Sequence, residues 1–117
     1  MESVAYRGVR LKVVFAIRDD ESIPARNFFD GLDRQWQARF LTLYTRLGDT
    51  GRISNPEQFS KFGDDFWEFK AFQVRMICYF LPGRRVVVTH GFAKKKDAFD
   101  KREIRRAEAI KSEYERI

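Results

Sequence analysis

The sequence predicts an α+β domain in the element order β-α-α-β-β-β-α, with a small, mainly antiparallel four-stranded sheet packed against two N-terminal helices and a C-terminal helix. Two observations predict this class. Three apolar, strand-like segments follow one another between residues 66 and 93, and helical periodicities flank them on both sides. A chain of 117 residues can build one core but not two, so we expect a single domain over residues 1–117.

The N-terminal part contains one expected strand and two expected helices. Residues 9–17 alternate between apolar and charged side chains and then become continuously apolar, which is typical of a strand. Ser22 and Pro24 mark the start of a short helix. The second helix is predicted by apolar residues at helical spacing, namely Trp36, Phe40, Leu43, Tyr44 and Leu47. We expect Gly48 to end it.

The C-terminal part contains three expected strands and the last helix. The strands cover residues 66–70, 74–80 and 86–92, with connections at residues 71–73 and 81–84. Asp100 is expected to cap the last helix, with Glu103 three residues later as in a capping box. The buried stripe of this helix is expected to be Ile104, Ala107, Ile110, Tyr114 and Ile117.

The composition favours a polyanionic partner and excludes several other classes. The chain has 23 Lys and Arg against 17 Asp and Glu, a net charge of +6 and a pI near 9.7, which favours nucleic acid. Cys78 is the only cysteine, so neither an internal disulfide nor a cysteine-based metal site can form. No apolar run approaches the length of a membrane span. We therefore expect a cytoplasmic protein without a membrane partner.

The register of the last hairpin decides whether its cationic side chains meet. If Phe80 faces Arg85, then Arg75 lies opposite His90 on the same face of the sheet. A three-residue loop with a bulge would instead shift the register by one residue and send His90 to the other face. The sequence leaves both registers open.

The preceding hairpin adds a carboxylate and a lysine to the same surface. If residues 71 and 74 face each other, Lys70 lies opposite Arg75 and Glu68 stands two residues further along that face. Each of these residues also has an ordinary structural explanation. Glu68 and Lys70 suit a solvated sheet face, a single histidine is often structural, and the lysines at 94–96 suit a solvated loop.

Several of these segments resemble one known family. The runs Phe-Trp-Glu-Phe-Lys at 66–70, Gln-Val-Arg at 73–75 and Thr-His-Gly-Phe at 89–92, followed by Lys94, Lys95 and a helix over 102–109, resemble the RelE/HigB toxin superfamily. The resemblance covers about residues 9–117 and is directed to the phage-derived, host-inhibition-like HigB branch. Members often have a proline after the paired lysines, where this chain has Asp97, Ala98 and Phe99.

The resemblance implies a RelE/ParE-like fold and a toxin of a type II toxin-antitoxin system. Such a toxin is expected to be an mRNA interferase, a metal-independent endoribonuclease without a cofactor that cleaves mRNA on the ribosome, inhibits translation and arrests growth. Its expected partners are the ribosome with its mRNA and a cognate helix-turn-helix antitoxin, and operator DNA is bound only through the antitoxin complex. The alternatives are a ParE-like toxin that inhibits DNA gyrase without cleaving RNA, or an inactive module bound to its antitoxin.

RNA cleavage by the neighbouring 2′-hydroxyl needs a base, an acid and cations for the phosphorane. Arg75 is expected to hold the phosphorane, since its planar guanidinium binds two phosphate oxygens and keeps its charge. His90 is the expected proton donor and Glu68 the expected base, with Lys94 or Lys95 as a substitute. Three further lysines are expected to bind the RNA backbone, namely Lys61, Lys70 and Lys96.

Overall fold

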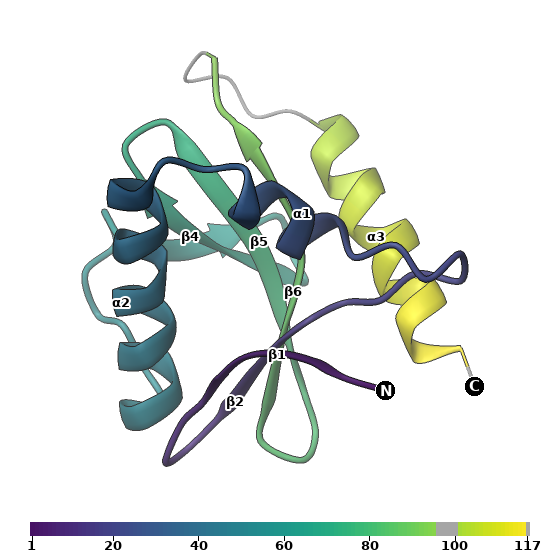
Figure 1. Ribbon diagram of the computed structural model, residues 1–117, viewed down its shortest axis with the longest axis horizontal. Coiled ribbons are helices and arrows are strands. Elements are labelled where there is room, and N and C mark those ends of the chain that lie inside the picture. Colours follow the sequence, from purple (N-terminus) through teal and green to yellow (C-terminus); the bar gives the residue numbers. More distant parts are fainter. Residues whose placement is uncertain (96–100, 117) are drawn as a thin grey trace.

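The computed structural model describes residues 1–95 and 101–116 and has a six-stranded sheet with helices on both faces (Figure 1). Its elements are β1 (Ser3–Arg7), β2 (Lys12–Phe15), α1 (Pro24–Asp30), α2 (Arg34–Thr50), β3 (Phe59–Phe62), β4 (Phe66–Ala71), β5 (Val74–Leu81), β6 (Arg85–Ala93) and α3 (Lys101–Glu115). The strand order is β1-β2-β6-β5-β4-β3. The pair β2 and β6 is parallel and the other neighbouring pairs are antiparallel.

The predicted α+β class is confirmed, whereas the four-stranded antiparallel sheet is wrong. The sheet is mixed, and it has six strands because β1 and β3 add one strand at each edge. These two strands have five and four residues. The strand expected over residues 9–17 is the shorter β2, and residues 8–11 belong to the connection from β1.

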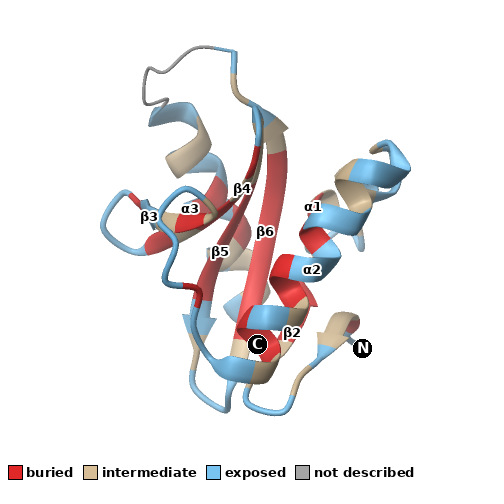
Figure 2. Ribbon diagram, turned by 90° about the vertical axis from the view of Figure 1, so that its left-hand side faces the viewer, coloured by how far each residue is buried: buried red, intermediate tan, exposed pale blue. Residues whose placement is uncertain are grey.

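The two faces of the sheet are covered by different helices. The core that α1 and α2 share with the sheet includes Phe40, Tyr44, Phe69, Met76 and Val88. The second core lies between α3 and the opposite face, and its buried residues include Ile77, Tyr79, Val87, Ala107 and Ile110. Strands β4 and β6 are buried along most of their length, and β5 is buried in its middle (Figure 2). Alternate residues of these strands therefore face different helices.

The end of α2 differs from its prediction. Gly48 does not end the helix, which continues to Thr50 and is capped by Gly51 at a φ of 82°, in the left-handed region that glycine tolerates. Gly48 serves another purpose. Its carbonyl accepts hydrogen bonds of 2.8 Å from the backbone N–H groups of Arg10 and Leu11, which brings the connection between β1 and β2 onto the helix backbone.

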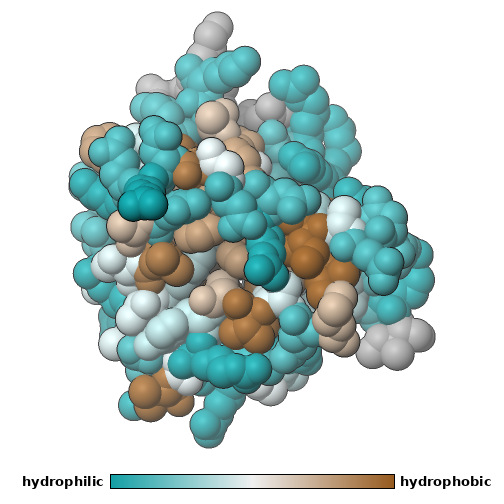
Figure 3. Space-filling model, viewed as in Figure 1, coloured by the Kyte–Doolittle hydropathy of each residue, from teal (hydrophilic) through white to brown (hydrophobic). Residues whose placement is uncertain are grey.

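Helix α3 carries the expected apolar stripe as far as the structure describes it. Ala107 and Ile110 are fully buried, and Ile104 and Tyr114 pack at the edge of the same core. The expected cap Asp100 and the last expected stripe residue, Ile117, lie outside the described residues. Within residues 1–95 and 101–116, no helix has the length and apolar character to cross a membrane. The face seen in Figure 3 is mainly hydrophilic, with apolar side chains in small separate patches.

Candidate functional site

The hairpin between β4 and β5 places the first predicted site residues together. Residues 71 and 74 face each other and Lys70 lies opposite Arg75, as predicted. Strand alternation puts Glu68 on the same face, which is the face covered by α3. Three of the predicted site residues therefore share one surface.

In the hairpin between β5 and β6, His90 lies on the same face of the sheet as Arg75, although the strands do not pair in the register that first suggested this. Phe80 lies opposite Val86, so the connection has three residues, as in the second of the two registers that the sequence left open. A bulge at Thr89 then shifts the register by a further residue, which places His90 opposite Ile77. Because the two shifts add to two residues, His90 returns to the face predicted for it.

Arg75 is therefore not paired directly with His90, which the first of the two open registers would have required. Phe92 lies directly opposite Arg75. His90, two residues earlier on the same strand, is the diagonal neighbour of Arg75. The rings of His90 and Phe92 are stacked with centroids 5.9 Å apart. The side chain of Phe92 thus stands beside the imidazole, on the same face as the guanidinium.

Arg75 and Glu68 form an ion pair at the centre of the site. Nε of Arg75 lies 3.0 Å from Oε1 of Glu68, although this N–H is not aligned as a hydrogen bond. Nη1 donates to the carbonyl oxygens of Phe72 and, at 3.1 Å, Val74. The two side chains remain 12% and 11% exposed, so solvent reaches the pair. These contacts hold the guanidinium through Nε and Nη1.

The electrostatic environment of Glu68 suits a proton acceptor. Burial raises the pKa of Glu68 above its usual range, while the positive charges of Lys70, Arg75 and Lys94 oppose that rise. A carboxylate with a raised pKa is a stronger base than an ordinary surface carboxylate. Strand alternation places Lys70 on the same face of the sheet as this carboxylate.

His90 is buried beneath α3 rather than open to a substrate. Its side chain is 0% exposed, and Nε2 lies 3.0 Å from Oε1 of Glu103. Nδ1 lies 3.0 Å from the hydroxyl oxygen of Thr89. Burial, with the positive charge of Arg106, lowers the pKa of His90 to about 3. The partly exposed carboxylate of Glu103 favours the charged ring, but the full desolvation of the ring is the larger influence, so the imidazole is neutral near pH 7.

This environment predicts a pH-dependent stability. The unfolded chain protonates His90 below a pKa of about 6.5 while the folded chain resists protonation, so the stability is complete above that pH and declines on acidification. The expected slope from this residue is about 1.4 kcal/mol per pH unit. Urea unfolding at a series of pH values measures it. His90→Gln keeps a donor and an acceptor without titrating, and its curve should be flatter than that of the wild type below pH 6.5. Parallel curves would contradict the assignment.

The predicted lysines do not all reach the site. Lys70 and Lys94 act on Glu68, and Nζ of Lys70 also donates to the carbonyl oxygen of Pro56 at 3.0 Å. Lys95 is exposed just beyond β6. Lys61 lies opposite Trp67 on the other face of the sheet, where its ammonium is 5.1 Å from the centroid of that ring, so the structure does not bring it to this site. The remaining predicted lysine, Lys96, lies outside the described residues.

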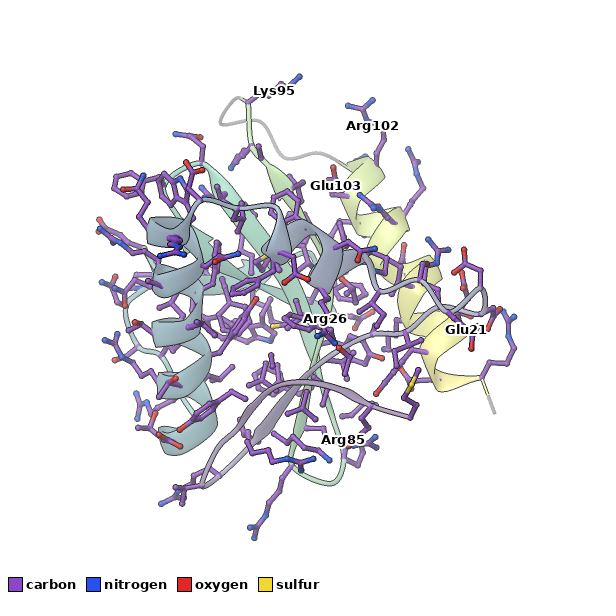
Figure 4. All side chains as sticks on the ribbon, viewed as in Figure 1. Glu21, Arg26, Arg85, Lys95, Arg102 and Glu103 are labelled. Carbon is purple, nitrogen blue, oxygen red and sulfur yellow. The ribbon has the colours of Figure 1, made fainter. Side chains whose placement is uncertain are left out.

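Helix α3 contributes charged residues that the sequence patterns did not assign to the site. Figure 4 shows Arg102 and Glu103 at the start of α3, at the same end of the molecule as Lys95. Glu103 was predicted as part of a capping box, yet its carboxylate contacts His90. Arg102 and Arg106 are four residues apart in α3, so helical spacing could have predicted that they lie on the same side of the helix.

No group of three or more His, Cys, Asp or Glu side chains in residues 1–95 and 101–116 is arranged to hold a metal ion.

One family model matches the chain over residues 27–112, and its description is phage derived protein Gp49-like (DUF891). The matched range runs from within α1 to within α3 and includes the whole cluster around Glu68 and Arg75. No curated protein matches the chain.

Proposed function

Because the chain belongs to the Gp49-like family of phage-derived proteins, a family of RelE-like toxins of toxin-antitoxin systems, we propose that it is an mRNA interferase of the HigB type. In this proposal the toxin cleaves mRNA on the ribosome and its cognate helix-turn-helix antitoxin holds it inactive. The observation that supports it best is the pairing of Glu68, a carboxylate with a raised pKa, with Arg75 on a surface that also carries Lys70 and Lys94.

The proposed reaction uses the 2′-hydroxyl of the RNA as the nucleophile. Glu68 accepts the hydroxyl proton while the 2′-oxygen forms a bond to the adjacent phosphorus. The bond from phosphorus to the 5′-oxygen then breaks, which leaves a 2′,3′-cyclic phosphate and a free 5′-hydroxyl. Arg75, with Lys94, stabilises the added negative charge of the phosphorane.

The departing 5′-oxygen needs a proton. His90 was the expected donor, but its imidazole is inaccessible and neutral near pH 7 in this structure. Lys94 and Lys95 directly follow β6, the strand that contains His90. An ammonium group can give up a proton as the phosphorane collapses. We therefore assign the donor to Lys94 or Lys95, and His90 supports the strand that carries them.

The burial of His90 is also compatible with an alternative function, the inhibition of DNA gyrase. A ParE-like toxin that inhibits DNA gyrase needs no accessible proton carrier, and the ion pair of Arg75 with Glu68 also suits a purely structural role. An inactive module that only binds an antitoxin is a further alternative. The three functions differ in what happens to cellular RNA when the protein is expressed alone.

A brief pulse of expression without antitoxin tests the proposal. New 5′-hydroxyl ends should appear within coding regions, and they should disappear when translation initiation is blocked, because the proposed substrate is mRNA on the ribosome. Mapping of 5′ ends across the transcriptome measures this. Full-length transcripts together with supercoiling defects would contradict cleavage and favour gyrase inhibition. Normal growth with intact RNA would favour the inactive module.

A further inference from the structure

The turn between β4 and β5 holds an aromatic residue in an unfavourable backbone conformation. Phe72 and Gln73 form a two-residue connection between the paired residues Ala71 and Val74, and Phe72 has a φ of 54°. A positive φ at the first position of a two-residue hairpin favours Gly, Asn or Asp, because a bulky side chain is strained there. A bulky aromatic at this position indicates a use for the ring that outweighs the strain.

The ring of Phe72 is not retained for the core. It is 65% exposed, whereas most of the large apolar residues of this chain are buried. Its contacts are at the surface of α2, where the Trp36 ring meets it edge to face with centroids 4.8 Å apart. Cζ of Arg39 lies 5.1 Å from the centroid of the Phe72 ring, in a cation-π contact. Arg39 thus lies over one face of the ring, and Phe72 still presents most of its surface to solvent.

The backbone of the same turn is tied to the proposed catalytic cluster. Nη1 of Arg75 donates to the carbonyl oxygen of Phe72, and the backbone N–H of Lys94 donates to that of Gln73 at 2.6 Å. The turn therefore joins the two sides of the sheet, because the Arg75 guanidinium lies on the α3 side while the Phe72 ring lies against α2 on the other side. An RNA strand whose phosphate lies on the cations would pass over the tip of this turn to bring a neighbouring base to the ring.

We propose that Phe72, flanked by Arg39, stacks an unpaired base of the RNA next to the cleaved phosphate. Single-stranded RNA is bound by this combination of an exposed aromatic ring with cations that follow the backbone. The net charge of +6 and the cations on both sides of the turn favour a polyanion over an apolar peptide as the occupant. This assignment rests on the proposed RNA substrate and identifies the part of the protein that recognises the base.

Binding of two uncleavable oligonucleotides tests the stacking. The probes are a short single-stranded 2′-O-methyl RNA and an abasic chain of the same length and charge, each followed by fluorescence anisotropy. Phe72→Gly suits the positive φ of the turn, so this variant is expected to fold at least as well as the wild type. It should bind the intact oligonucleotide about 10-fold more weakly and the abasic chain as well as the wild type does. Phe72→Tyr keeps an aromatic ring and should bind the intact oligonucleotide as tightly as the wild type does.

Phe80 supplies the matched control. It is another exposed phenylalanine, 43% accessible, near the opposite end of β5 from the turn. Phe80→Ala should keep the preference of the wild type for the intact oligonucleotide. Unchanged RNA binding by Phe72→Gly would overturn the stacking role, and loss of antitoxin binding in that variant with RNA binding unchanged would assign the ring to a protein interface. A wild type that binds neither probe and cleaves no mRNA would overturn the proposed function itself.

Discussion

Replacing Arg75 with alanine is expected to reduce mRNA cleavage by about 100-fold or more, because it removes the cation that would stabilise the phosphorane. It should also lower the free energy of unfolding by about 1–3 kcal/mol, since Glu68 keeps a largely buried carboxylate without its partner. Mapping of RNA ends measures the first effect, and urea unfolding measures the second. Growth arrest at the wild-type level by a folded Arg75→Ala protein would contradict the assignment.

Two further variants separate the chemical role of Arg75 from its structural role. The double variant Glu68→Gln with Arg75→Ala removes both charges of the pair, so its stability should recover toward that of the wild type while cleavage stays lost. Arg52→Ala removes the same charge from an exposed position in the connection after α2 and should leave both properties unchanged. Recovery of cleavage in the double variant would mean that the guanidinium acts only on the fold and that Glu68 is not the base.

Replacing Gly8 with alanine is expected to destabilise the protein by about 3 kcal/mol. A Cβ at this position would lie 2.2 Å from the backbone carbonyl carbon and oxygen of Gly48, and backbone atoms within a helix cannot move aside. The connection between β1 and β2 would have to leave α2 and lose its hydrogen bonds to the Gly48 carbonyl. Thermal or urea unfolding measures the loss.

Gly31→Ala is the matched control for this steric argument. A Cβ there would meet only the carbonyl oxygens of Asn27 and Phe28, both at 3.6 Å, which is ordinary contact. Its backbone is close to helical, with a φ of −85°. This variant should keep the stability of the wild type. Equal losses in both variants would show that the close approach of Gly8 to Gly48 is not the cause.

The sequence predicted the long periodic elements because each contains enough apolar residues to set a period. The stripe of α2 and the central strands β4 to β6 are examples. It missed β1 and β3 because a strand of four or five residues with polar positions among its apolar ones shows too short a pattern. Gly48 was mistaken for a helix end because a glycine after a periodic run is the usual signal, and only the chain that packs on it explains its place inside α2.

The candidate site was predictable where turns fixed the register. The two-residue turn before β5 determines the pairing of Lys70 with Arg75, and this prediction is confirmed. The bulge at Thr89 has no sequence signal of its own, so the exact partner of His90 could not be predicted. The burial of His90 beneath α3 could not be predicted either, because it depends on how a distant helix packs on the sheet and strand alternation gives only the face on which a residue lies.

The position of β6 between β2 and β5 has a consequence for synthesis of the chain. The parallel pair joins Lys12 to Arg85, so the N-terminal hairpin has no neighbouring strand until the last strand has left the ribosomal tunnel. Pairing between such distant segments makes folding slow compared with that of a helical protein. The sheet therefore stays incomplete until β6 has been made, and the surface that carries Arg75 and Glu68 forms only after that.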